Sequence, residues 1–342
     1  MTWLWLGFFA LVFIMLALDL GVFHRKAHEI SLREALGWTT FWVVLGLSFS
    51  GLVYLMYEHH WGGAGEFTSG PKQGTPHLHG LDAMVLYLTG YLLEESLSVD
   101  NLFVISLLMT SMRVPGKYQH RLLFWGILGA LVFRGTMITG GVWLVNRFTW
   151  TFYIFGGFLV ISGVRMLFAG DDAEPEPEAS WFFRMIQKVI PIAKQQHGSR
   201  FLARENGKIV FTYLAVALLA IELTDIVFAV DSVPAILAVT TEPFIVITSN
   251  VFAILGLRSL YFVLAGMMSK FRYLKTALSI LLVVIGGKML AHDVYQVPNL
   301  ISLAVVVGVV GIGVATSFFV DRREIRRSQM MRAVLPPPDE EP

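Results

Sequence analysis

The chain has 342 residues, of which 55% are hydrophobic and 15% charged, and its net charge at neutral pH is +1. Soluble domains carry about a quarter charged residues, so this composition indicates a protein that crosses a membrane several times. There is no cysteine, which excludes disulfides and thiolate metal sites. We expect the lipid bilayer as the main partner and no nucleic acid.

A bilayer span takes about 20 mostly apolar residues. The first segment lacks the basic start and small-residue cleavage site of a signal peptide, so we expect a retained helix. The prediction is an all-α polytopic membrane protein with about nine transmembrane helices, in one transmembrane domain over residues 1–320. The candidate spans are 3–23, 37–57, 81–110, 121–145, 150–169, 210–237, 243–267, 275–292 and 299–320.

The basic residues of the loops alternate in a regular way. Twenty of the 26 Lys and Arg fall in the tail or in loops after the first, third, fifth and seventh spans, and only Lys72 and Arg147 fall in the other loops. Loops rich in Lys and Arg stay in the cytoplasm. The pattern therefore predicts an N-terminus outside and a C-terminus in the cytoplasm.

Three segments lie outside the predicted spans. Residues 58–80 form an outer loop with four His, which we interpret as a flexible polar loop, with metal collection as the alternative. Residues 170–209 form a cytoplasmic linker that begins with a Pro-broken acidic run expected to be disordered, followed by a short interfacial helix over 181–188. The tail, 321–342, is expected to be cytoplasmic and disordered.

Two parts of the chain resemble each other. Residues 159–167 match 282–290 at five of nine positions, and Arg134 recurs as Arg258 and Asp100 as Asp225, at offsets of 123 to 125. We infer a repeat of three spans, from about 81–169 and again from about 210–292. An odd number of spans inverts the second copy, and inverted repeats are typical of secondary transporters with a site near the membrane midplane.

Six carboxylates lie inside two otherwise apolar spans. A charged side chain at the bilayer centre costs about 3 kcal/mol, so such residues are expected to be functional. Helical spacing places Glu94, Ser98 and Asn101 on one face and Glu222 and Asp225 on another. Pro234 is expected to loosen its helix so that Asp231 turns inward. The acids are Glu94, Glu95, Asp100, Glu222, Asp225 and Asp231.

Carboxylate and amide oxygens suit hard divalent cations such as Mn²⁺, Ca²⁺ and Mg²⁺. We therefore predict metal ligands at Glu94, Asp100, Asn101, Glu222, Asp225 and Asp231. Clustered carboxylates do not all stay ionised, so protons should bind when the metal leaves. Arg134 and Arg258 are expected to serve as counter-ions or gating residues. Glu95 points away from Glu94 and is left undecided.

Two other hypotheses explain the acids. They are either internal salt bridges that fix helix packing, or the machinery of an intramembrane protease. The protease signatures Gly-x-Gly-Asp and Glu-Glu-x-x-x-Arg are absent, as are zinc-protease and Walker motifs. We therefore expect no enzyme and no prosthetic group.

The chain resembles the TerC family, and within it the Alx-like branch. The resemblance rests on three stretches, Glu94–Phe103, Ile221–Ile236 and Thr248–Arg258, and extends over roughly residues 5–320. It implies an inner-membrane protein related to the LysE exporter superfamily, with roles in Mn²⁺ export, metal supply and tellurite resistance. It also implies functional acids at Glu94, Asp100, Glu222, Asp225 and Asp231.

From these observations we expect a proton-coupled Mn²⁺ exporter with its ion between the two repeats. Mn²⁺ itself follows from the resemblance, whereas the residues alone indicate only a hard divalent cation, with Ca²⁺ as an alternative. The competing hypothesis is a membrane scaffold that transports nothing and assists other membrane proteins in a stress-response or metal-delivery complex.

Overall fold

The computed structural model describes residues 2–18, 31–65, 78–112, 114–148, 150–168, 200–205, 208–265, 274–291, 294 and 297–334. Nine α-helices lie within these residues, one in each predicted span: α1 (Thr2–Leu18), α2 (Leu32–Glu58), α3 (Gly80–Ser111), α4 (Gly116–Arg147), α5 (Thr151–Phe168), α7 (Tyr213–Val239), α8 (Pro243–Ala265), α9 (Leu274–Leu290) and α10 (Asn299–Val334). The all-helical architecture is therefore confirmed for the described part of the chain.

Two small elements accompany the helices. The 3-10 helix η2 (Trp61–Gly63) follows α2, and strands β1 (Leu202–Glu205) and β2 (Lys208–Phe211) pair antiparallel just before α7. The strands were not expected from the sequence. Thr212 follows β2 directly, and its hydroxyl caps the start of α7 because it accepts a hydrogen bond from the Ala215 amide at 3.3 Å.

Six of the described helices are long and apolar enough to cross a membrane: α2, α4, α5, α7, α8 and the first part of α10. Helices α1 and α9 are apolar but have only 17 residues each. Helix α3 has 32 residues, and its acidic side chains lower its hydropathy. The chain is thus a multi-pass membrane protein, and nine spans remain a prediction.

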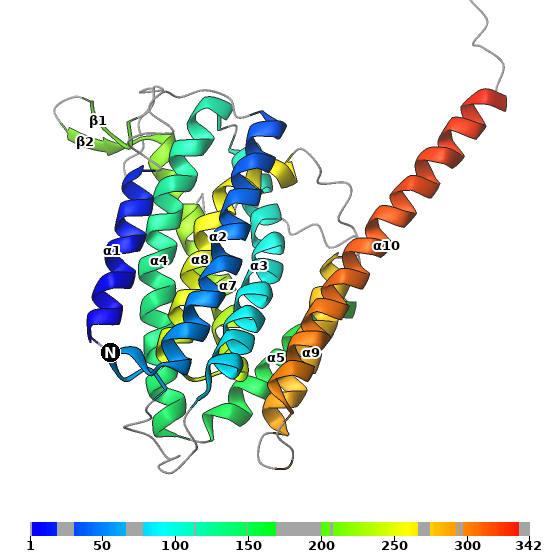
Figure 1. Ribbon diagram of the computed structural model, residues 1–342. Helices are drawn as coiled ribbons and strands as arrows, with labels where there is room; N and C mark the ends of the chain where they lie inside the picture. The colour runs from blue at the N-terminus through cyan, green and yellow to red at the C-terminus, as the bar shows by residue number, and fades with distance from the viewer. Residues whose placement is uncertain are drawn as a thin grey trace, which may run out of the picture.

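The helices form two groups that lean against each other (Figure 1). Helices α1–α4, α7 and α8 form a bundle, and α5, α9 and α10 form a second group beside it. The principal contacts join α5 to α9, α3 to α8 and α4 to α7. Helix α8 lies at the centre of the bundle, because 83% of its most apolar 18-residue stretch is buried. Only 17% of the corresponding stretch of α10 is buried.

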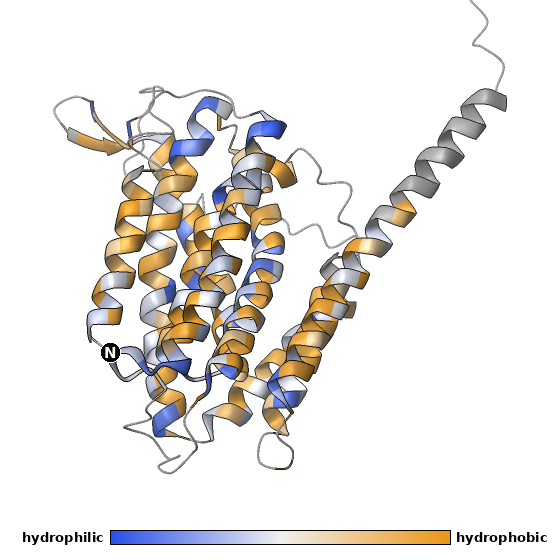
Figure 2. Cartoon of the chain, viewed as in Figure 1, coloured by the Kyte–Doolittle hydropathy of each residue, from blue (hydrophilic) through white to orange (hydrophobic). Residues whose placement is uncertain are grey.

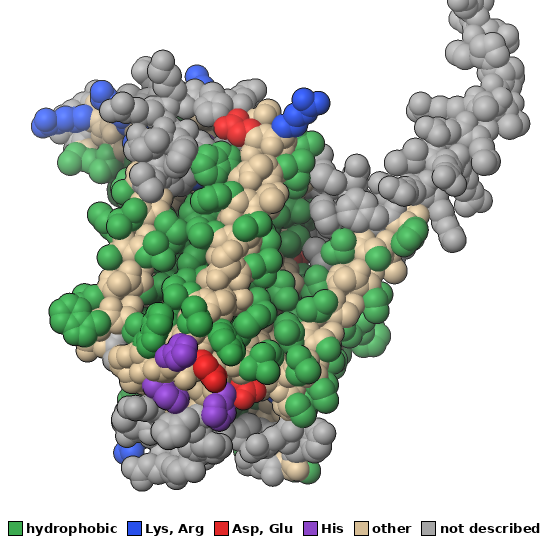
Figure 3. Space-filling model, in the orientation of Figure 1, with side chains coloured by type: hydrophobic (Ala, Val, Ile, Leu, Met, Phe, Trp, Pro, Cys, Tyr) green, Lys and Arg blue, Asp and Glu red, His purple; other side chains and the backbone are tan. Residues whose placement is uncertain are grey.

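The surface has the character expected of a membrane protein. Hydrophobic residues cover most of the outward helix faces, and hydrophilic residues gather near the helix ends and inside the bundle (Figure 2). In the space-filling view, most of the visible Lys and Arg lie at the end that carries the strands, whereas the visible His side chains and several Asp and Glu side chains lie at the opposite end (Figure 3). An apolar belt between two polar ends matches a bilayer.

Two expectations about local structure are wrong. Helix α7 runs unbroken through Pro234, so this proline does not loosen the turn that contains Asp231. Proline removes only one backbone donor, and the buried Pro234 lies inside a helix whose other turns continue on both sides. Helix α10 continues to Val334, so residues 321–334 are helical rather than disordered.

Several sequence predictions fall outside the described residues. These are the acidic run at 171–178, the interfacial helix at 181–188, the end of the tail at 335–342 and most of the histidine-bearing outer loop, 66–77.

Candidate functional site

The side chain of Arg134 forms the centre of a buried polar network. It projects from the middle of α4 and is 1% exposed. Its Nε and Nη2 donate to the two carboxylate oxygens of Asp225 on α7, at 3.1 and 2.8 Å, and its Nη1 donates to Glu94 on α3. Two parallel hydrogen bonds between one guanidinium and one carboxylate make a strong, directional pair. Three helices are therefore joined at one cation.

Glu94 accepts hydrogen bonds from its own helix and from α8. It is fully buried, and it accepts hydrogen bonds from the Ser98 hydroxyl at 3.0 Å and from the Asn250 amide nitrogen at 3.3 Å. Asn101 lies one turn beyond Ser98 and, in the orientation that satisfies its amide, accepts from Arg134 Nη2 at 3.1 Å. The polar face predicted for α3 thus exists and meets Arg134.

Glu222 lies one turn before Asp225 on α7 and borders the network. Its carboxylate lies against Gly129 of α4, where any side chain would overlap it. Its Oε2 is buried and accepts no hydrogen bond from the described residues. The glycine therefore makes room for an acid that keeps one oxygen available.

Two further predicted ligands, the predicted counter-ion Arg258 and the undecided Glu95 occupy other positions on these helices. Asp231 accepts a hydrogen bond from Ser162 of α5 at 3.0 Å, so it faces the second helix group. Asp100 is half-buried on α3, next to Asn101. Arg258 is 5% exposed within α8. Glu95 accepts from Tyr91 of its own helix at 3.1 Å, on a different face from Glu94.

The structure therefore brings together Glu94, Asn101, Asp225 and Arg134, with Glu222 beside them, and it places Asp231 elsewhere. Among the described residues, no three His, Cys, Asp or Glu side chains converge in a way that could hold a metal ion. In this conformation the Arg134 guanidinium occupies the position between the two central carboxylates.

Sequence reasoning missed three residues that contact predicted site residues. Asn250 contacts Glu94, Gly129 receives Glu222, and Ser162 binds Asp231. A polar residue in the midst of an apolar span was an available signal for Asn250. Gly129 and Ser162 gave no signal, because their role depends on which helices become neighbours.

The network contains fewer positive groups than carboxylates. One guanidinium faces two fully or largely buried carboxylates, those of Glu94 and Asp225. A buried charge without compensation costs several kcal/mol, so the second carboxylate needs a proton or another cation. The network can therefore exchange cations chemically: a proton, the tethered arginine and an external ion are alternatives for the same oxygens.

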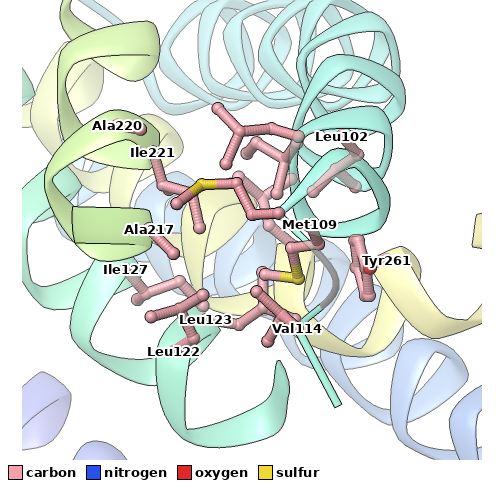
Figure 4. Close-up of a cluster of buried hydrophobic side chains, with 14 of the residues drawn as sticks. Leu102, Met109, Val114, Leu122, Leu123, Ile127, Ala217, Ala220, Ile221 and Tyr261 are labelled. Carbon is pink, nitrogen blue, oxygen red and sulfur yellow. The ribbon is translucent and has the colours of Figure 1, made fainter. Parts of the chain in front are cut away.

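Apolar side chains seal the network on one side. We define the Met109 cluster as the labelled residues of Figure 4, which fill the space between α3, α4, α7 and α8 towards the end that carries the strands. They are Leu102, Met109, Val114, Leu122, Leu123, Ile127, Ala217, Ala220, Ile221 and Tyr261.

A second apolar cluster lies on the other side of the network along α4 and α7. We define the Val142 cluster as Ile138, Val142, Val145, Ala229, Val233, Ile236, Leu237 and Val246. It joins the later turns of α4 and α7 to the start of α8. The charged groups are therefore closed off towards both ends of the bundle.

Another buried acid lies outside the helices. Glu242, in the turn between α7 and α8, is 7% exposed and accepts a hydrogen bond from the Tyr57 hydroxyl of α2 at 3.0 Å. Burial raises the pKa of Glu242, and the bond from Tyr57 opposes part of that rise. This contact joins α2 to the α7–α8 turn near one end of the bundle.

The fold and this network define a class: an integral membrane protein of many helices with a closed, charged site inside. Residues 79–325 match the model of the integral membrane protein TerC family. The chain belongs to that family, as its three motif stretches suggested.

Named relatives cover almost the whole chain. An uncharacterized membrane protein, STKORF319, of Myxococcus xanthus is 47% identical over 319 residues, with 93% of each chain covered. A putative membrane-bound redox modulator, Alx, of Escherichia coli K12 is 42% identical over 310 residues, covering 90% of this chain and 91% of its own. No solved structure matches the chain.

Proposed function

We propose that this protein transports a divalent metal ion across the inner membrane, that Mn²⁺ is the ion it exports, and that protons move in exchange. The observation that supports this most is the position of Arg134, a cation enclosed by Glu94 and Asp225 deep in the bundle. Such a position suits a transported cation once the arginine withdraws.

The ligand chemistry agrees with a hard ion. The network offers carboxylate, amide and hydroxyl oxygens, and the chain has no thiol. Mn²⁺, Mg²⁺ and Ca²⁺ prefer oxygen ligands of this kind. Mn²⁺ is chosen because of the TerC and LysE resemblance. Glu222, with an acceptor oxygen one turn from Asp225, would receive the ion as Arg134 leaves.

Proton exchange follows from the unequal charge count. With Arg134 in place, the network lacks one positive charge, which a proton can supply. A divalent ion brings two charges, so its arrival would displace both the proton and the guanidinium. This is the charge balance that an ion–proton exchanger requires.

The α5–α9 crossing supports an inverted repeat. A methyl group at Gly286 would lie 2.7 Å from the Gly156 carbonyl oxygen, and one at Gly163 would lie 2.7 Å from the Ser279 carbonyl oxygen. At the offset of 123, Gly163 corresponds to Gly286 and Gly156 to Ser279. The two contacts are therefore the same contact repeated, as expected for copies related by a two-fold axis in the membrane plane.

The closed network agrees with alternating access. The Met109 and Val142 clusters would open in turn, one towards each side of the membrane. The end that carries the strands would face the cytoplasm, because Lys and Arg gather there (Figure 3). We therefore propose that the N-terminus is outside and the C-terminus inside.

The name of the Alx relatives suggests a second candidate, a membrane-bound redox modulator. This chain has no cysteine, so its own side chains offer no thiol–disulfide chemistry. A redox role would have to act through a partner, as in the scaffold hypothesis. Such a role needs no metal flux.

Flux in proteoliposomes tests the proposal. The purified protein should move Mn²⁺ and protons in opposite directions. Glu94→Gln should abolish both fluxes, because it removes a carboxylate from the network, whereas Glu95→Gln, its neighbour on another face, should retain most of the flux. Intact protein with no flux above that of empty vesicles would contradict transport.

A further inference from the structure

The side chain of Asn250 differs from its polar neighbours on α8. The hydroxyls of Thr248 and Ser249 donate to carbonyls of their own helix, those of Phe244 at 2.6 Å and Val246 at 3.1 Å. Asn250 instead reaches across to α3 and donates its Nδ2 to Glu94 Oε2 at 3.3 Å. It is thus the one of these three polar side chains that enters the network.

The carbonyl end of the same amide is buried and lacks a donor. Asn250 is 3% exposed, and its Oδ1 receives no hydrogen bond from any described residue. A buried acceptor without a partner destabilises the folded protein, because the atom loses its hydrogen bonds to water. The carboxylate of Glu94 accepts from Nδ2, so turning the amide over would place two acceptors face to face. The orientation of Oδ1 is therefore fixed by Glu94.

We propose that Asn250 Oδ1 is a ligand of the transported divalent cation, next to Glu94. This rests on the proposed transport function and adds a neutral oxygen ligand from α8, which none of the acidic residues supplies. A neutral amide oxygen suits a hard cation such as Mn²⁺ or Ca²⁺ and adds no negative charge to a network that already lacks a positive one.

The proposal explains why the amide remains in a costly arrangement. Its nitrogen donates to Glu94, and its oxygen is buried with its lone pairs available. When Arg134 withdraws from Glu94, the carboxylate and the amide oxygen form a ready-made pair of oxygen ligands. The ion then satisfies the acceptor that the described residues leave without a donor.

Substitutions at position 250 distinguish a ligand from a residue that only positions Glu94. Asn250→Ala removes both ends of the amide. Asn250→Asp keeps an oxygen at the ligand position but replaces the amide nitrogen with a second oxygen, which cannot donate to Glu94 when the carboxylate is ionised. A ligand role predicts weaker Mn²⁺ binding in Asn250→Ala, by tenfold or more, and binding in Asn250→Asp that stays within about threefold of the wild type or becomes tighter. A positioning role predicts that both variants lose affinity alike.

The measurement is Mn²⁺ titration of the full-length protein in detergent, by calorimetry, with thermal unfolding to show that each variant is folded. Asn250→Ser replaces the alanine variant if that variant does not fold. Ser249→Ala, which removes a hydroxyl bonded within α8, should bind Mn²⁺ like the wild type.

The outcomes separate the two proposals. Wild-type protein that neither binds nor transports Mn²⁺ would overturn the proposed function and this inference together. Wild-type binding with equal losses in Asn250→Ala and Asn250→Asp, or with no loss in Asn250→Ala, would overturn the ligand role of Asn250 alone.

Discussion

Two buried helix contacts differ in the groups that form them. One is the polar network of α3, α4, α7 and α8, and the other is the crossing of α5 and α9. The network is joined by charged side chains that meet at Arg134. The crossing is joined by backbone, since Gly286 and Gly156 bring the two helices close enough to exclude any side chain.

This difference has a mechanical consequence. Side-chain contacts with several acceptors can exchange one cation for another, so the helices around Arg134 can repack. A backbone contact between glycines has no alternative partner and favours a single arrangement. If the protein transports an ion as proposed, we expect the network to change during each cycle and α5 and α9 to move together, with Asp231 and Ser162 as a polar contact between the two groups.

Of the substitutions that test this comparison, removal of Arg134 should cause the largest loss of stability. Arg134→Gln leaves Glu94 and Asp225 without their cation, and breaking a buried ion pair from one side costs about 3–5 kcal/mol. Thermal unfolding in detergent should show a large loss. The double variant Arg134→Gln with Asp225→Asn should regain much of that stability while remaining without flux. A double variant no more stable than Arg134→Gln would contradict the electrostatic explanation.

Gly286→Ala should have an intermediate effect. The added methyl group would meet the Gly156 carbonyl, and overpacking a tight contact costs about 1–3 kcal/mol. Gly287→Ala is the matched control, because a methyl group there meets nothing within 4 Å. The same contrast should hold for Gly163→Ala and Gly157→Ala in the other half of the crossing. Equal unfolding temperatures within each pair would argue against backbone contact.

Glu242 should show the smallest effect, through pH. Burial raises the pKa of Glu242, so the folded protein favours the protonated form more than the unfolded chain does. The contribution to stability is complete below the unfolded pKa, about 4.3 for glutamate, and is lost as pH rises through the folded pKa. Unfolding temperatures should thus fall with rising pH, and Glu242→Gln should flatten that fall. A pH slope unchanged by this substitution would exclude Glu242 as its source.

The sequence was sufficient for the helices and for part of the site. Apolar length placed a helix in each of the nine spans, and helical spacing placed Glu94, Ser98 and Asn101 on one face of α3. These features depend on local periodicity. A counter-ion role for Arg134 was also predicted, because this residue lies near the middle of a span next to the acidic ones.

Features that depend on which helices become neighbours could not be predicted from the sequence. Spacing alone could not show that Asp231 meets Ser162 while Asp225 meets Arg134. The effect of Pro234 was overestimated, since α7 continues through this residue to Val239. The strands before α7 were missed because two runs of four residues carry little pattern.

Helix α10 has a geometric consequence of its own. Its 36 residues, at about 1.5 Å each, make a rod of about 54 Å, whereas the hydrocarbon core of a bilayer is about 30 Å thick. Because α10 packs on α9 and α3, it touches both helix groups. A tilt of about 10° about the first residue of α10 would move the far end of the rod by about 9 Å. The helix would thus act as a lever that converts a small rearrangement within the membrane into a displacement large enough for a distance probe to follow.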